Sequence, residues 1–85
     1  MSGVGIPYDR LRSLSARELI RALLHDGFVL LRQEGSHQRY AHRDGRRVTV
    51  TFHSLGQTFP LKTLKSMLEK QAGWTAKDLE SLGIL

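Results

Sequence analysis

The sequence contains no cysteine, which excludes a disulfide framework, a thiolate zinc site and a cysteine nucleophile. It also lacks any apolar run that approaches the roughly 20 residues of a membrane-spanning helix. Residues 1–12 have no apolar stretch of the kind found in a signal peptide. We therefore expect a cytoplasmic protein with no segment in a membrane.

Acidic residues are scarce: eight Asp and Glu face thirteen Lys and Arg, and the net charge at pH 7 is +5. Such a chain favours polyanionic partners, above all nucleic acids, although membrane surfaces and acidic proteins attract it for the same reason. The length of 85 residues suits one compact domain and is too short for two. We expect a single domain over residues 15–85 and a poorly ordered arm over residues 1–14, where no clear hydrophobic period is present.

The first helix is predicted to begin after Ser15. Ser15 and Glu18 form a capping box, in which the serine oxygen and the glutamate carboxylate bind free backbone amides. Apolar residues then recur at helical spacing up to Leu24, and Gly27 supplies a C-terminal stop. This pattern indicates one amphipathic helix.

Three strand-like runs follow, over residues 28–33, 36–42 and 47–52. The first pair is separated by a turn at Glu34 and Gly35, and the second pair by a loop over residues 43–45, in which Gly45 can adopt a left-handed conformation. Residues 61–72 again have helical spacing, and a short terminal helix is predicted after Thr75. The order α-β-β-β-α with a short C-terminal helix predicts an α+β fold, with a three-stranded antiparallel sheet and helices on one face.

The length of the second loop decides which side chains share a face of the sheet. A three-residue loop pairs His42 with Arg46, whereas a two-residue loop mixes polar and apolar residues on both faces. We favour the first register because it separates the two kinds of residue. The predicted buried face carries Tyr40, Val48, Val50 and Phe52, and the opposite face carries His37, Arg39, Arg47, Thr49 and Thr51.

Several segments occur in an order and spacing that match a known family. They are residues 18–20, 26–28, 32–37, 45–50, 63–64 and 71–73, together with His53. In these segments the chain resembles the HicA (YcfA-like) mRNA interferase toxins of HicAB toxin–antitoxin pairs, over roughly residues 13–82. The most specific part is Gly35-Ser36-His37 before a basic hairpin. Phe52 and Lys62 depart from the pattern, since many members have proline and glycine there.

The resemblance implies a fold like that of a double-stranded-RNA-binding domain, an endoribonuclease activity on mRNA and a HicB-type antitoxin that blocks it. It also implies that His37 is the catalytic residue. RNA supplies its own nucleophile, the 2′-hydroxyl, so cleavage needs a base, an acid and positive charge near the phosphate, but no metal or cofactor. Histidine suits proton transfer because its side chain ordinarily titrates near neutrality.

RNA-binding residues are expected around this histidine. Arg39 is the best candidate to stabilise transition-state charge, because it lies two residues from His37 and on the same face. His53 is a candidate second proton-transfer group. The other candidates for RNA contact are Gly35, Ser36, Arg32, Arg46, Arg47, Lys62 and Lys65.

Simpler interpretations of the same residues remain open. The glycine and serine suit an ordinary turn, the arginines and lysines a solvated surface, and His53 an inert loop position. A non-catalytic double-stranded-RNA-binding module is the alternative function, and a domain that only binds an acidic protein is a third. A metal site is not expected, because His37 and His42 lie on opposite strand faces and no cysteine is available.

Overall fold

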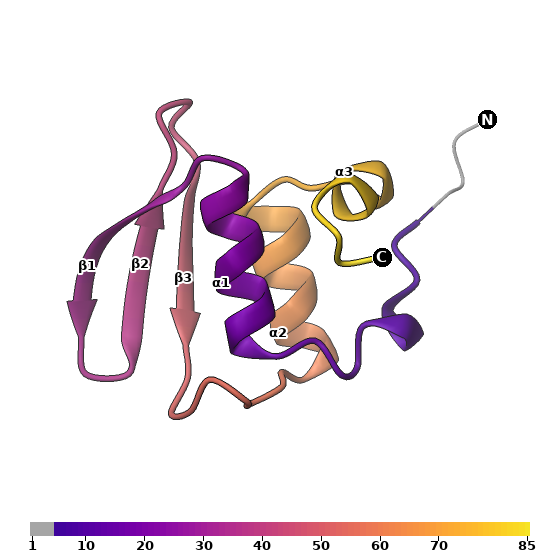
Figure 1. Cartoon of the computed structure of the whole chain (residues 1–85), viewed down its shortest axis with the longest axis horizontal. Helices are drawn as coiled ribbons and strands as arrows, with labels where there is room; N and C mark the ends of the chain where they lie inside the picture. The colour runs from indigo at the N-terminus through magenta and orange to yellow at the C-terminus, as the bar shows by residue number, and fades with distance from the viewer. Residues whose placement is uncertain (1–4) are drawn as a thin grey trace.

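The computed structural model describes residues 5–85, which form a three-stranded antiparallel sheet of order β1-β2-β3 with helices against one face (Figure 1). The predicted α+β fold and element order are confirmed. A short 3-10 turn, η1 (Tyr8–Arg10), precedes the main elements. These are α1 (Ala16–His25), β1 (Val29–Glu34), β2 (His37–Ala41), β3 (Arg47–Thr51), α2 (Leu61–Lys65), the π-helical turn η2 (Ser66–Gln71) that continues α2, and α3 (Ala76–Ser81).

Helix α1 begins and ends as predicted. The Ser15 hydroxyl accepts a hydrogen bond from the Glu18 amide, and the Glu18 carboxylate accepts one from the Ser15 amide at 2.9 Å. This contact lowers the pKa of Glu18. At the other end Gly27 has a φ of 103°, and the Phe28 amide donates to the Leu23 carbonyl. This is a Schellman ending, and it turns the chain from α1 directly into β1.

The predicted register between β2 and β3 is confirmed. His37 lies opposite Thr51, and Tyr40 lies opposite Val48. The hairpin loop spans residues 43–45, and the His42 amide donates to the carbonyl of Arg46 at 3.0 Å across it. The separation of polar from apolar residues therefore determines this hairpin, as the pattern predicts.

The turn between β1 and β2 is tight. Glu34 pairs with His37, so Gly35 and Ser36 are its central residues. Gly35 has a φ of 59°, the value expected of the first central residue in a type II′ turn. The turn therefore places His37 at the very start of β2, at the lower end of the sheet in Figure 1.

The hydrophobic core lies between the sheet and the helices. Tyr40, Val48 and Val50 are buried on this face, as predicted. Phe52 differs from the expectation, because it is only half-buried where β3 has already ended. Helices α1 and α2 with η2 cover the β3 side of the sheet, whereas β1 forms the opposite, outer edge (Figure 1).

The N-terminal segment differs from the predicted arm. Residues 1–4 of that arm lie outside the described residues. Within residues 5–14, Leu11 and Leu14 are 1% and 6% exposed and pack in the core. The segment has no regular apolar period from which this burial could be predicted. We therefore propose that the domain begins before Ser15.

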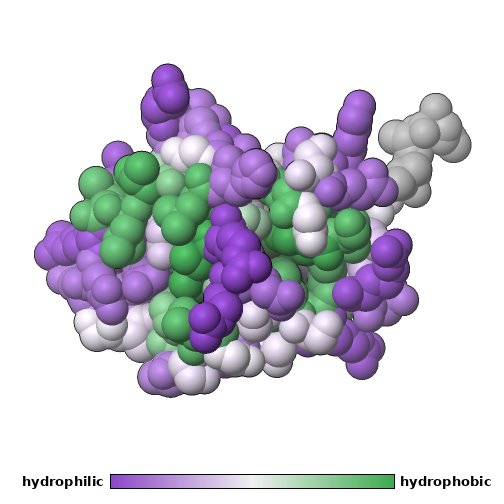
Figure 2. All heavy atoms as spheres, in the orientation of Figure 1, coloured by the Kyte–Doolittle hydropathy of each residue, from purple (hydrophilic) through white to green (hydrophobic). Residues whose placement is uncertain are grey.

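The edge strand β1 exposes an unusual amount of apolar surface. Val29, Leu30 and Leu31 are each at least 45% exposed, and a β-bulge interrupts the pairing at Leu31. Figure 2 shows hydrophobic side chains over this side of the molecule. Within residues 5–85, no helix is long and apolar enough to cross a membrane.

Candidate functional site

His37 is exposed on the sheet face that the helices leave open. Its Nδ1 lies 2.9 Å from the hydroxyl oxygen of Thr51, its partner across the strands. Within residues 5–85, its Nε2 has no hydrogen-bond partner. When Nδ1 carries the proton and donates it to Thr51, the lone pair of Nε2 faces solvent. The contact with Thr51 therefore orients the ring on the open face.

The open face also carries arginines next to His37. Arg39 is exposed two residues along β2, and Arg32 lies opposite it on β1. Arg32 forms an ion pair of 2.9 Å with Glu34, but both side chains are more than half exposed, so this pair is weak. Within residues 5–85, Arg39 and Arg47 have no acidic partner. Arg39 is therefore the cationic residue of this face that lies nearest to His37 along β2.

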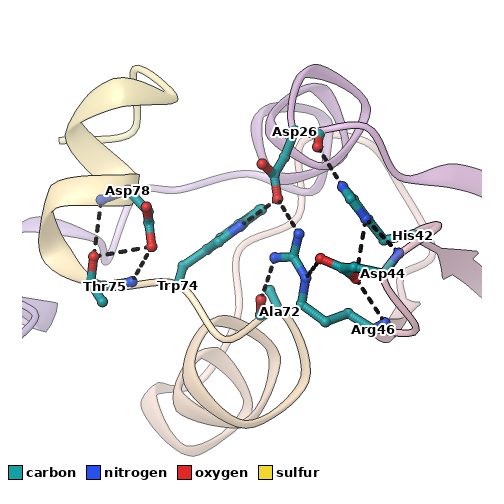
Figure 3. Close-up of polar contacts among 8 residues, drawn as sticks. All are labelled: Asp26, His42, Asp44, Arg46, Ala72, Trp74, Thr75 and Asp78. Atoms are coloured by element: carbon teal, nitrogen blue, oxygen red, sulfur yellow. Dashed lines mark hydrogen bonds and ion pairs between the residues drawn. The ribbon is translucent and has the colours of Figure 1, made fainter.

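Arg46 lies at the other end of the sheet and is occupied by protein contacts. Its guanidinium forms ion pairs with Asp44 at 2.7 Å and with Asp26 at 3.1 Å, and donates to the Ala72 carbonyl at 2.7 Å (Figure 3). It also lies 4.9 Å from the centre of the Phe28 ring. The structure therefore does not bring Arg46 together with His37. Its position indicates a structural role.

Further polar contacts complete this cluster. The indole of Trp74 donates to the Asp26 carboxylate at 2.9 Å, and His42 Nε2 lies 2.8 Å from the Asp26 carbonyl (Figure 3). The Asp44 amide also lies 3.1 Å from His42 Nδ1. The backbone amide of Arg46 is the main cause of the lowered pKa of Asp44. The cluster joins α1, the β2–β3 hairpin and the segment after η2.

Replacing Arg46 by alanine is expected to lower the free energy of unfolding by about 1–3 kcal/mol, because Asp26 and the Ala72 carbonyl lose a shared donor. The partial exposure of the pair keeps the effect below that of a buried ion pair. Urea denaturation at pH 7 measures it. Arg39→Ala is the matched control and should change stability by less than about 0.5 kcal/mol. Equal free energies of unfolding for the two variants would contradict a structural role of Arg46.

A small hollow opens beside the β1–β2 turn. Its volume is about 300 Å³, and it is lined by Gln33, Gly35, Ser36, Phe52 and His53. The hollow brings Gly35, Ser36 and His53 together, whereas His37, which follows Ser36, is not among its lining residues. Gln33 and Phe52 were not predicted as site residues, because their proximity depends on the pairing of all three strands.

The predicted lysines lie in a different layer. Lys62 and Lys65 are exposed on α2, and the Lys65 ammonium lies 5.7 Å from the centre of the Tyr8 ring. The Tyr8 hydroxyl in turn donates to Glu69, and burial is the main cause of its raised pKa. The structure thus does not place these lysines on the sheet face with His37. Among residues 5–85, no group of three His, Asp or Glu is arranged to hold a metal ion.

Comparison with known families finds a matching family model. The model of the family described as HicA toxin of bacterial toxin–antitoxin matches residues 16–74, from the first residue of α1 to Trp74. The matched region includes the Gly35-Ser36-His37 turn and the whole sheet. A comparison with curated proteins finds no match. Because the family model covers well over half of the sequence, the chain belongs to the HicA toxin family of bacterial toxin–antitoxin systems.

Proposed function

We propose that this toxin is a cytoplasmic endoribonuclease that cleaves mRNA, with His37 as its catalytic residue and without a metal or cofactor. The observation that carries the proposal is the exposed His37 ring, oriented by Thr51 and accompanied by Arg39 on an open sheet face. A titratable group with one nitrogen held and the other free is suited to general base catalysis. Membership of the HicA toxin family also supports the proposal, because cleavage of mRNA would make the protein toxic to the cell.

In the proposed reaction, Nε2 of His37 removes the proton from a ribose 2′-hydroxyl. The 2′-oxygen then bonds to the adjacent phosphorus, and the bond from phosphorus to the 5′-oxygen breaks. The departing oxygen takes a proton from solvent or from His53. The products are a 2′,3′-cyclic phosphate and a 5′-hydroxyl. Arg39, assisted by Arg32, stabilises the negative charge that collects on the phosphate oxygens.

The remaining predicted residues act in binding. Gly35 and Ser36 let the RNA backbone approach the turn, and Arg47 attracts phosphate further along the same face. Lys62 and Lys65 contact RNA that extends around the helices. We leave Arg46 out of this set because its guanidinium is occupied.

Cleavage is tested by incubating the purified protein with end-labelled RNA in the presence of EDTA. The proposal predicts strand breaks under these conditions. A non-catalytic double-stranded-RNA-binding module is the alternative, favoured by the element order and by the two exposed lysines of α2. It predicts binding that weakens steeply with salt and leaves the RNA intact.

We also propose that the antitoxin of this system is an acidic, HicB-type protein that covers the open sheet face. The support comes from the basic residues of that face and from the exposed apolar edge strand β1 beside it. Such a complex should hide His37 and inhibit cleavage. If the protein binds an acidic partner but never cleaves RNA, its basic face serves protein binding alone.

Thr51 is expected to act by positioning His37. Thr51→Val removes the hydroxyl but keeps the shape, and should lower kcat about 5- to 10-fold with little change in KM, since one hydrogen bond is worth about 1 kcal/mol. Thr51→Ser should restore most of the rate. Rescue by serine, together with a change in kcat but not in KM, separates a positioning role from a merely structural one. Unchanged kinetics in Thr51→Val would show that the contact has no catalytic role.

A further inference from the structure

The hollow is lined by residues of the β1–β2 turn and of the chain that leaves β3. These two segments lie at the lower end of the sheet (Figure 1). We propose that the hollow binds one unpaired nucleobase of the RNA, adjacent to the phosphate at which the RNA is cleaved. Phe52 supplies the stacking surface, and Gln33 reads the edge of the base. This inference rests on the proposed ribonuclease function and names the part of the substrate that the site recognises.

The hollow and His37 are close neighbours on two strands. Ser36 directly precedes His37, and Phe52 directly follows Thr51, the partner of His37. The Phe52 amide donates to the Ser36 carbonyl at 3.0 Å, which joins the two sides. Consecutive residues of a strand point to opposite faces, so the hollow opens around the end of the sheet from His37. A nucleotide with its ribose at His37 can therefore turn its base over the strand end.

The chemistry of the lining fits a base better than a phosphate. None of the lining residues carries a permanent positive charge, whereas arginines gather on the open face. A half-buried aromatic ring stands beside an amide, a hydroxyl and an imidazole. Proteins recognise unpaired RNA bases in this way, by stacking on an aromatic side chain and hydrogen bonding at the base edge. The volume of about 300 Å³ is at the lower limit of ligand pockets and suits one base.

A relay of hydrogen bonds orients the Gln33 amide. The buried Tyr40 hydroxyl donates to Gln38 Oε1 at 2.6 Å, and Gln38 Nε2 donates to Gln33 Oε1 at 3.2 Å. Gln33 Oε1 thereby accepts a hydrogen bond from Gln38. The Nε2 group of Gln33 is the part of its amide that can bind a ligand. Gln33 Nε2 lies 3.5 Å from the carbonyl oxygen of Gly35, which is long for a hydrogen bond. Gln33 thus presents a donor to the hollow, and a base with an acceptor on its exposed edge should be preferred.

The shape of the turn keeps the entrance open. Gly35 has a φ of 59°, and a Cβ atom built on it would meet nothing within 4 Å. The glycine is required by the turn conformation, and the space beside it is free for a ligand. His53 lines the same hollow, with its backbone amide held by Gln57 at 2.9 Å.

The test maps cleavage sites on a random-sequence RNA by sequencing the new 5′ ends. The wild-type chain should show a base preference beside the cut. Gln33→Ala should flatten this preference, and Phe52→Leu, which keeps an apolar side chain but removes the aromatic face, should raise KM about 10-fold. Lys77→Ala, an exposed residue of α3, is the control and should leave both unchanged. An unaltered preference and KM in both variants would overturn the base site.

A binding experiment separates this inference from the ribonuclease proposal. The probe is a 2′-O-methyl dinucleotide, which cannot be cleaved through its 2′-oxygen, titrated into the wild-type protein and followed by NMR. Shifts centred on Gln33, Phe52 and His53 support the base site even if wild-type protein leaves RNA intact, a result that would overturn the ribonuclease proposal alone. Cleavage of RNA without shifts at these residues would overturn the base site alone.

Discussion

His37→Ala is expected to lower the rate of RNA cleavage by about 10²–10⁴-fold, the usual contribution of a general acid or base. Among residues 5–85, no other side chain is hydrogen-bonded to Thr51 Oγ1. No other group is therefore held in the place of the imidazole to replace it as the base. The rate is measured on a labelled RNA with a single cleavage site, at equal concentrations of folded protein. Induced expression of the variant in cells should also fail to arrest growth.

Two observations make this variant informative. His37 is exposed and its one hydrogen bond is at the surface, so its removal should change the free energy of unfolding by less than about 1 kcal/mol. His25→Ala is a matched control, because His25 is also exposed but lies at the end of α1. A fully active His37→Ala protein would end the mechanistic proposal.

Phe28→Ala is expected to lower the free energy of unfolding by about 3–5 kcal/mol, the typical cost of deleting a buried aromatic ring. Phe28 is 1% exposed, and its ring meets His42 and Trp74 edge to face at 5.1 and 6.3 Å. A domain of this size has a total stability of only about 4–13 kcal/mol. The loss therefore removes a large fraction of it, which guanidinium denaturation can measure.

Phe28→Leu serves as the control for this prediction, because it retains apolar volume but loses the aromatic contacts with His42 and Trp74. It should cost clearly less than Phe28→Ala. If Phe28→Ala lowered stability by less than about 1 kcal/mol, the cluster around Asp26 and Arg46 would not be the support of the hairpin that its contacts indicate.

The parts of the fold that could be predicted depend on local or periodic signals. The capping residues Ser15 and Glu18 mark the start of α1, and the alternation in β2 and β3 determines their register, because a shift of one residue would bury Arg39 and expose Tyr40. The same alternation predicts that His37 lies on the polar face of the sheet, which the structure confirms. These signals require no knowledge of distant contacts.

The parts that could not be predicted depend on contacts between distant segments. Arg46 looks like any hairpin arginine until Asp26 and the Ala72 carbonyl are brought to it from other elements. The hollow lined by Gln33 and Phe52 forms only when β1, β2 and β3 are paired. Leu11 is buried although the sequence around it has no hydrophobic periodicity that would predict this. In each case tertiary packing, rather than local preference, decides the role of the residue.

The central claim is that this toxin cuts RNA by activating the ribose hydroxyl of its own substrate. Mass spectrometry of the fragments produced by the purified protein in EDTA tests it most directly. New 2′,3′-cyclic phosphate and 5′-hydroxyl ends are the expected result. Intact RNA, or fragments with 3′-hydroxyl and 5′-phosphate ends, would contradict it.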